Sequence, residues 1–328
     1  MKNVNKTIAL LLSVVLLLSL AVGCSGSAPE SSAPPSQSPA PEGQTSQSGG
    51  EPESPWPEKS VTVIVPYNPG GDSDFNARAL CERLTAVSGQ SFVVTNVNGN
   101  SGAVGSLQAL SSDPDGYTIL FNHLTFMVNY FTGNSTLTYD DLEVGGIVGY
   151  RDDGALVARA DLGITKLSDI VTYSQEHGGM LYGASAGSLI MMAGFELRDQ
   201  GANLTIVDAG GAADRLASLL GGHVDFTYVS ASDVTDYVAT GELTILENDL
   251  GSAAVTLPTY YQMLFPKGTD PAIIDKFAAL CKEAIFEDEA YASTIMTAYG
   301  QEPYYKEPQE AAKILEEVWE QLAGYTWQ

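Results

Sequence analysis

Two short segments of this chain combine glycine with small polar residues in a way that suits binding or catalysis. Residues 183–187 read Gly-Ala-Ser-Ala-Gly, the G-x-S-x-G pattern of a serine nucleophile on a strand–turn–helix. A hydrolase would then use Ser185 as nucleophile, with Asp208 and His223 following in the chain order of that pattern. Against this, His223 lies in a turn before an expected strand, and only one expected helix separates it from Asp208. The alternative is a loop whose hydroxyls and amides hold an anion at a helix N-terminus. Its candidate residues are Ser185, Gly187 and Ser188.

The second segment is the Pro-Gly-Gly-Asp-Ser-Asp run at 69–74, between an expected strand at 60–66 and an expected helix at 75–87. Glycine lets backbone approach a ligand, and a helix N-terminus favours a carboxylate or phosphate. The run matches neither a Walker A loop nor G-x-G-x-x-G, and no lysine follows, so nucleotide binding is not expected. The alternative is a tight turn in which Asp74 only caps the helix. The candidate ligand-binding residues here are Tyr67, Gly70, Gly71 and Asp74, and Tyr228, at the end of a later expected strand, is a further cleft candidate.

Composition excludes several classes of function. The 328 residues include 15 Lys and Arg against 40 Asp and Glu, a formal charge of -25, so nucleic acid is not an expected partner. Three histidines without ligand-like spacing predict no metal site, and no cofactor is expected. Cys81 and Cys281 fall in expected helices as small buried residues, and a disulfide between them is the alternative.

The N-terminal region predicts export. Lys2 and Lys6 precede an apolar run at 8–22, which is shorter than the about 20 residues that span a bilayer. Leu-Ala-Val-Gly before Cys24 resembles a lipobox, so we expect a signal peptide over 1–23 and a lipidated Cys24 that attaches the chain to the outside of the cell membrane. An ordinary secretory signal with a chance cysteine is the alternative. Residues 24–58 are rich in Ser, Pro and Gly and are expected to be a disordered tether.

From residue 59 onward, β-branched apolar runs alternate with helical patterns. This alternation predicts an α/β fold with mostly parallel sheets. Glycine-rich turns recur at the expected strand ends, where such sheets bind ligands.

An ordered set of motifs resembles one known family. The chain resembles the substrate-binding receptors of the tripartite tricarboxylate transporters, also called Bug receptors, over residues 59–325. The motifs that carry this resemblance are 63–71 with Asp74 and Arg78, 89–94 with Asn96, Gly99, Gly102 and Gly105, 113–120, 184–188, 219–225 with Gly211, and 266–269.

The resemblance implies a two-lobed, periplasmic-binding-protein-like (type II) fold with a ligand cleft between the lobes. Lobe I would comprise 59–158 plus 259–328, and lobe II 159–258. The resemblance implies that the chain is a solute receptor and not an enzyme. It would close on a small carboxylate held by the loops at 67–74 and 185–188, and would deliver it to transporter membrane subunits. A receptor that serves a signalling partner instead is the alternative.

The chain departs from the family pattern in three places. Met191-Met192 stand where the family has a histidine, Asp208-Ala209 replace Pro-Tyr, and the segment at 246–265 is unmatched. These departures predict a change in the ligand more than in the fold. An Asp208 near the cleft would disfavour a carboxylate or favour an amine-bearing ligand.

Overall fold

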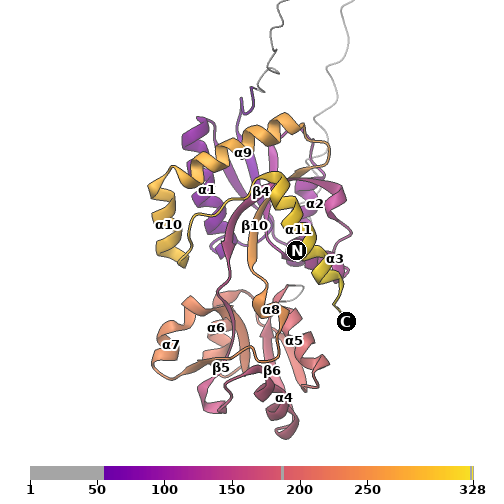
Figure 1. Cartoon of the computed structure of the whole chain (residues 1–328), viewed down its shortest axis with the longest axis vertical. Helices are drawn as coiled ribbons and strands as arrows, with labels where there is room; N and C mark the ends of the chain where they lie inside the picture. The colour runs from indigo at the N-terminus through magenta and orange to yellow at the C-terminus, as the bar shows by residue number, and fades with distance from the viewer. Residues whose placement is uncertain (1–54, 186–187, 326, 328) are drawn as a thin grey trace, which may run out of the picture. The chain divides into compact units, whose positions relative to one another are not determined.

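The computed structural model describes residues 55–185, 188–325 and 327. These residues form two five-stranded sheets, each flanked by helices (Figure 1). The prediction of an α/β fold with two lobes is therefore confirmed. The expected signal peptide, Cys24, the tether as far as residue 54 and Gly187 lie outside the described residues.

The first sheet forms from strands at both ends of the described chain, in the order β2-β1-β3-β10-β4. Its strands are β1 (Val61–Val65), β2 (Phe92–Asn96), β3 (Thr118–Asn122), β4 (Leu142–Arg151) and β10 (Thr259–Pro266). Its helices are α1 (Asp72–Ser88), α2 (Ala103–Leu110), α3 (Thr125–Phe131), α9 (Pro271–Phe286), α10 (Glu289–Tyr299) and α11 (Pro308–Ala323). Helices α9 and α10 both pack against α1 (Figure 1).

The second sheet has the order β7-β6-β8-β5-β9. Its strands are β5 (Gly154–Arg159), β6 (Met180–Ala184), β7 (Leu204–Asp208), β8 (Phe226–Ser230) and β9 (Leu243–Ile245). The helices along this stretch are α4 (Leu167–Glu176), α5 (Ile190–Asp199), α6 (Ala212–Leu220), α7 (Thr235–Ala239) and α8 (Ala253–Thr256).

Strand direction follows the same pattern in both sheets, and it differs from the mostly parallel sheets that we expected. β1 is parallel to β2 and β3, and β6 is parallel to β7 and β8. The fourth strand, β10 or β5, runs antiparallel to both of its neighbours. Both sheets are therefore mixed, because the strands that carry the chain between the sheets enter them in the opposite direction.

The chain passes between the sheets twice. It leaves β4 at Arg151 and enters β5 at Gly154, and it returns from β9 to β10 through a segment that contains α8. Residues 154–158, which we assigned to lobe I, thus belong to β5 of the second sheet. Strand β5 pairs with β8 and β9, and these strands cannot be identified as its partners from local sequence.

The folded body begins earlier than the sequence predicted. Trp56, placed in the expected tether, is only 3% exposed, and its Nε1–H donates to the Gly116 carbonyl at 3.2 Å. Its ring lies against Phe92 and Phe277, with ring centroids 6.2 Å apart in each pair. A tryptophan buried among aromatic rings contributes much apolar area to the core, so residues 55–58 belong to the folded lobe.

The two described cysteines are free thiols in the core of the first lobe. Burial raises the pKa of Cys81 to about 12, so this thiol stays protonated and unreactive at neutral pH. Among the described residues, no helix is both long enough and apolar enough to cross a membrane.

Candidate ligand-binding site

The loop after β1 is shaped by glycine and held by one buried carboxylate. Gly70 has φ +84°, a conformation that favours glycine, and Gly71 is the N-cap of α1 with extended backbone. Asp74 accepts hydrogen bonds from the Gly70 N–H at 2.9 Å, from Arg78 Nε at 3.0 Å and from Asn96 Nδ2 at 3.0 Å. Burial alone would raise the pKa of Asp74, but these donors hold it below its ordinary value. The Asp74 carboxylate is thus engaged in holding the loop in place.

Tyr67, just after β1, belongs to a polar network at the ends of β1 and β3. Its hydroxyl donates to Asn122 Oδ1 at 2.6 Å, and Asn122 Nδ2 donates to Ser106 Oγ at 3.0 Å. The Tyr67 ring stacks on His123, with centroids 4.8 Å apart and an interplanar angle of 7°. His123 Nδ1 accepts from the Thr125 N–H at 3.2 Å, which leaves its proton on Nε2. Burial lowers the pKa of His123 to about 4, so this stacked pair is uncharged at neutral pH.

The first residue of α1, Asp72, links the loop to the crossing between the sheets. It accepts the Tyr261 hydroxyl, and Arg151 Nη1 lies 3.5 Å from its Oδ1. Arg151 also pairs with Asp153 at 3.2 Å and donates to Ser230 Oγ on β8. Burial raises the pKa of Asp72. This network is not predictable from the sequence, in which its only signal is a charged Arg-Asp-Asp turn between two apolar strands.

The loop after β6 is tied to the turn before α6. Ser185 Oγ donates to the Gly210 carbonyl and accepts from Arg215 Nη1 at 2.7 Å. Ser188 Oγ donates to the Ser185 carbonyl at 2.7 Å, which closes the turn into α5. Arg215 is likewise not predictable as a site residue, since its only signal in the sequence is a single arginine in a helix that follows Gly-Gly.

Tyr228 lies on β8 near both Arg215 and the crossing. Its carbonyl accepts from Arg215 Nε at 3.2 Å and from Nη2 at 3.1 Å. Its hydroxyl occupies the space that a β-carbon at Gly154 would need, so Gly154 must lack a side chain while Tyr228 keeps this position. Burial raises the pKa of Tyr228 to about 12, so its hydroxyl remains a hydrogen-bond donor at neutral pH.

The hydrolase hypothesis has no geometric support in the part of the chain that the structure describes. Among the described residues, the Ser185 hydroxyl bonds to Gly210 and Arg215, and neither is an imidazole. A guanidinium donates hydrogen bonds and cannot accept the serine proton, so it cannot replace His223 as the general base.

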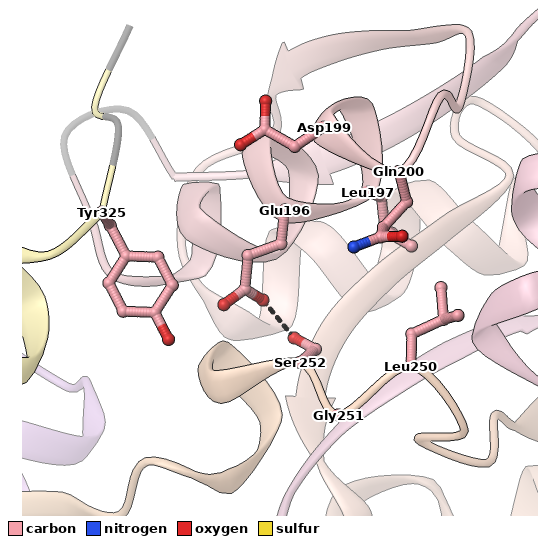
Figure 2. Close-up of a pocket in the computed structure, with 8 residues that line it drawn as sticks. All are labelled: Glu196, Leu197, Asp199, Gln200, Leu250, Gly251, Ser252 and Tyr325. Carbon is pink, nitrogen blue, oxygen red and sulfur yellow. Dashed lines mark hydrogen bonds between the residues drawn. The ribbon is translucent and has the colours of Figure 1, made fainter.

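Two cavities lie on α5, and only one adjoins the Ser185 loop. The first, of about 250 Å³, contains Glu196, Asp199 and Tyr325 (Figure 2). Glu196 accepts the Ser252 hydroxyl and the Ala253 N–H at the start of α8, so its carboxylate is used to cap that helix. Two carboxylates make this cavity unsuitable for an anion.

The second cavity, of about 310 Å³, starts at Ala184 beside the Ser185 loop. Met191 and Asp208, two of the departures from the family pattern, line it together with Phe195 and Arg198. Among the residues with described positions, no group of three or more His, Cys, Asp or Glu side chains is arranged to hold a metal ion.

Comparisons with known proteins agree with this architecture. The sequence profile described as "Tripartite tricarboxylate transporter family receptor" matches residues 76–323. A UPF0065 protein of the gbd 5' region of Cupriavidus necator is 26% identical over 289 residues, covering 80% of this chain and 85% of that protein.

Two solved structures from Rhodopseudomonas palustris share the fold. MatC with bound malate has a TM-score of 0.67 at 19% identity and covers 81% of this chain and 97% of its own. A second protein, solved with adipate, has a TM-score of 0.66 at 22% identity and covers 82% and 97%. The solved structure of the periplasmic binding protein BugD has a TM-score of 0.67 at 24% identity and covers 81% of this chain and 97% of its own, which confirms the periplasmic-binding-protein-like fold class.

Proposed function

The chain belongs to the receptor family of the tripartite tricarboxylate transporters, and we propose that it is an extracytoplasmic binding protein for a small carboxylate. One observation carries the proposal. β1 and β6 are the middle strands of the parallel trios in their sheets. β1 is followed by Gly70, Gly71 and α1, and β6 by Ser185, Ser188 and α5. Loops at the carboxyl ends of parallel strands, beside helix N-termini, favour anionic ligands. The malate and adipate bound by the two fold neighbours support the same ligand class.

Each site residue then has a distinct role in this proposal. Backbone amides near Gly70 and Gly71 hold one end of the ligand, and the Ser185–Ser188 turn, which includes Gly187, holds the other. Tyr67 and Tyr228 border the ligand. Asp74 acts through the loop that it fixes, since its carboxylate already accepts bonds from Gly70 and Arg78. The net charge of -25 does not exclude anion binding, because local amide dipoles act at short range and the field of distant charges is screened.

Function in transport follows from closure around the ligand. The lobe that contains the first sheet and the lobe that contains the second sheet would close as a hinge across the two crossings, without covalent chemistry. The closed form would dock on the membrane subunits of the transporter. The Arg151 network supports this part of the proposal, because it joins Asp72 of α1 to Ser230 of β8 by noncovalent contacts that a hinge motion can exchange.

The test is thermal unfolding of the full chain in mild detergent, with malate, adipate, succinate, citrate, aromatic acids and amino acids. An acid present at 100 times its Kd stabilises a protein by about 2.7 kcal/mol, which raises the Tm of a body of this size by about 5 °C. At least one acid is expected to produce such a shift. If every acid leaves the Tm unchanged and an amine-bearing or neutral solute raises it, the carboxylate proposal is wrong.

Attachment to the membrane through Cys24 is part of the same proposal. It is supported by the lipobox-like sequence at 20–24 that follows the apolar run. Mass spectrometry of the mature N-terminal peptide is expected to show a chain that begins at Cys24 and carries acyl groups. A mature peptide that begins elsewhere, or an unmodified Cys24, would rule out lipidation.

A further inference from the structure

Arg215 is a buried cation whose hydrogen bonds all go to neutral oxygen atoms. The residue is 5% exposed on α6. Its guanidinium donates to the Tyr228 carbonyl at 3.2 and 3.1 Å, to the Gly210 carbonyl at 3.0 Å and to Ser185 Oγ at 2.7 Å. Among the described residues, no carboxylate oxygen lies within 4.0 Å, the limit for an ion pair, of the Arg215 guanidinium nitrogens. Four other arginines do pair with carboxylates, namely Arg78, Arg83, Arg151 and Arg159.

The acidic residues nearest in sequence are engaged elsewhere. Asp214 accepts the Gly211 N–H at 3.2 Å, and Asp208 accepts the Gly210 N–H at 3.3 Å. Both carboxylates therefore bind the backbone of the turn before α6. Burial lowers the pKa of Arg215, yet a guanidinium starts so high that it stays charged at neutral pH.

The charge of Asp214 acts on Arg215, but among the described residues no carboxylate is in ion-pair contact with its guanidinium. A buried cation without such a contact is unfavourable for folding, which makes it a candidate for a role in ligand binding. We propose that Arg215 supplies the positive charge by which the Ser185 loop selects a carboxylate. This inference rests on the proposed function and identifies the charge of the ligand group at that loop. Arg215 is a positioning and specificity-determining residue, since it acts through Ser185.

The hydrogen bonds around Gly210 explain how Ser185 passes from the free to the bound state. The Gly210 carbonyl accepts from both the Ser185 hydroxyl and Arg215 Nη1. When a carboxylate arrives, the Ser185 O–H turns toward it, and the Gly210 carbonyl keeps its bond from Arg215. The Gly210 carbonyl therefore still has a donor when the Ser185 hydroxyl turns away from it. Arg215 continues to donate to Ser185 Oγ, which polarises the hydroxyl toward the anion.

The experiment compares acids with uncharged analogues in variants of the full chain. The probes are malate, adipate, succinate and citrate, each beside its fully amidated analogue, and the readout is affinity by titration calorimetry. Arg215→Gln is expected to weaken acid binding at least about tenfold and to lower the acid-to-amide affinity ratio by a similar factor. Arg215→Lys retains the charge and is expected to keep most of that ratio. Arg159→Gln removes the same charge from an arginine paired with Asp161 and Asp225, and it is expected to leave the ratio unchanged.

The outcomes separate this inference from the proposed function. If no acid of the thermal-unfolding panel binds the native chain, both fail. If an acid binds the native chain and Arg215→Gln keeps the acid-to-amide ratio, only the role of Arg215 is overturned. A purely structural role for Arg215 would weaken acid and amide alike, which also overturns the inference. If Arg215→Gln does not fold, the acid-to-amide affinity ratio is measured in Arg215→Lys and in Ser185→Ala instead. A ratio that Arg215→Lys keeps and Ser185→Ala lowers supports the proposed role of Arg215. Any other pattern rejects that role.

Discussion

Gly71→Val is expected to weaken binding of the carboxylate by at least about a hundredfold, equivalent to about 2.7 kcal/mol. The reason is the position of the added side chain. A β-carbon at Gly71 would have only the Asn68 carbonyl near it, at 3.8 Å, so the valine side chain would enter the open space at the start of α1. That is the space through which the ligand is proposed to reach the loop amides.

The fold should tolerate this change. Gly71 has φ -84° and ψ 173°, which any L-residue adopts, and a poorer N-cap lowers the free energy of unfolding by about 1 kcal/mol. Calorimetric titration with the acid that stabilises the native chain measures the loss, and Gly71→Ala, which adds a single methyl group, should show a smaller one. Unchanged affinity in Gly71→Val would remove this loop from the site.

Trp56→Ala is expected to lower the free energy of unfolding by about 3–5 kcal/mol, the range for a large aromatic side chain removed from a core. The indole is 3% exposed, and its ring stands 6.2 Å from Phe92 and 6.2 Å from Phe277, centroid to centroid. Its N–H also satisfies the Gly116 carbonyl, which the alanine would leave without that donor. Urea unfolding of the full chain measures the change.

Truncation provides the matched control for Trp56. A chain that begins at Lys59, the boundary predicted from sequence, is expected to lose as much stability as Trp56→Ala, whereas a chain that begins at Pro55 should keep the native value. Trp56→Phe, which retains a ring but no N–H, should fall between them. If Trp56→Ala changes the unfolding free energy by less than about 1 kcal/mol, residues 55–58 belong to the tether after all.

Local sequence was sufficient to predict a strand or helix where the pattern of that element does not depend on a distant partner. The β-branched run at 60–66 became β1, and the following helical pattern became α1, which begins at Asp72 because Gly71, and not Asp74, occupies the N-cap. Within the long strand β4, the sequence itself predicts only a short strand at 147–148, because glycines at 145 and 149 obscure the pattern. These glycines make room for the Phe265 and Tyr261 rings of β10, which lie where their side chains would stand. That requirement becomes visible only once β10 is known to pair with β4.

In the candidate site too, features set by neighbouring residues could be predicted from sequence, and contacts between distant residues could not. Glycine and serine at strand ends identified both loops, because the conformation of a turn depends on the residue types within it. Arg215 could not be placed in the site in advance. Its acceptors are on Tyr228 of β8 and on Ser185, just after β6, so its role depends on how β6, β8 and α6 are arranged. The link from Arg151 to Asp72 likewise spans 79 residues of sequence.

The position of β10 also bears on the biosynthesis of this protein. A ribosome delivers the chain from its N-terminus, so β1 to β4 and the whole second sheet are made before residues 259–266. Until then β3 and β4 have no strand between them, and each presents an open edge. The second sheet, drawn from the continuous stretch 154–245, needs no later strand for its own pairing. The first sheet is therefore the first to be synthesised and the last to be completed. Its open strand edges have to be kept from pairing with other chains until β10 is available.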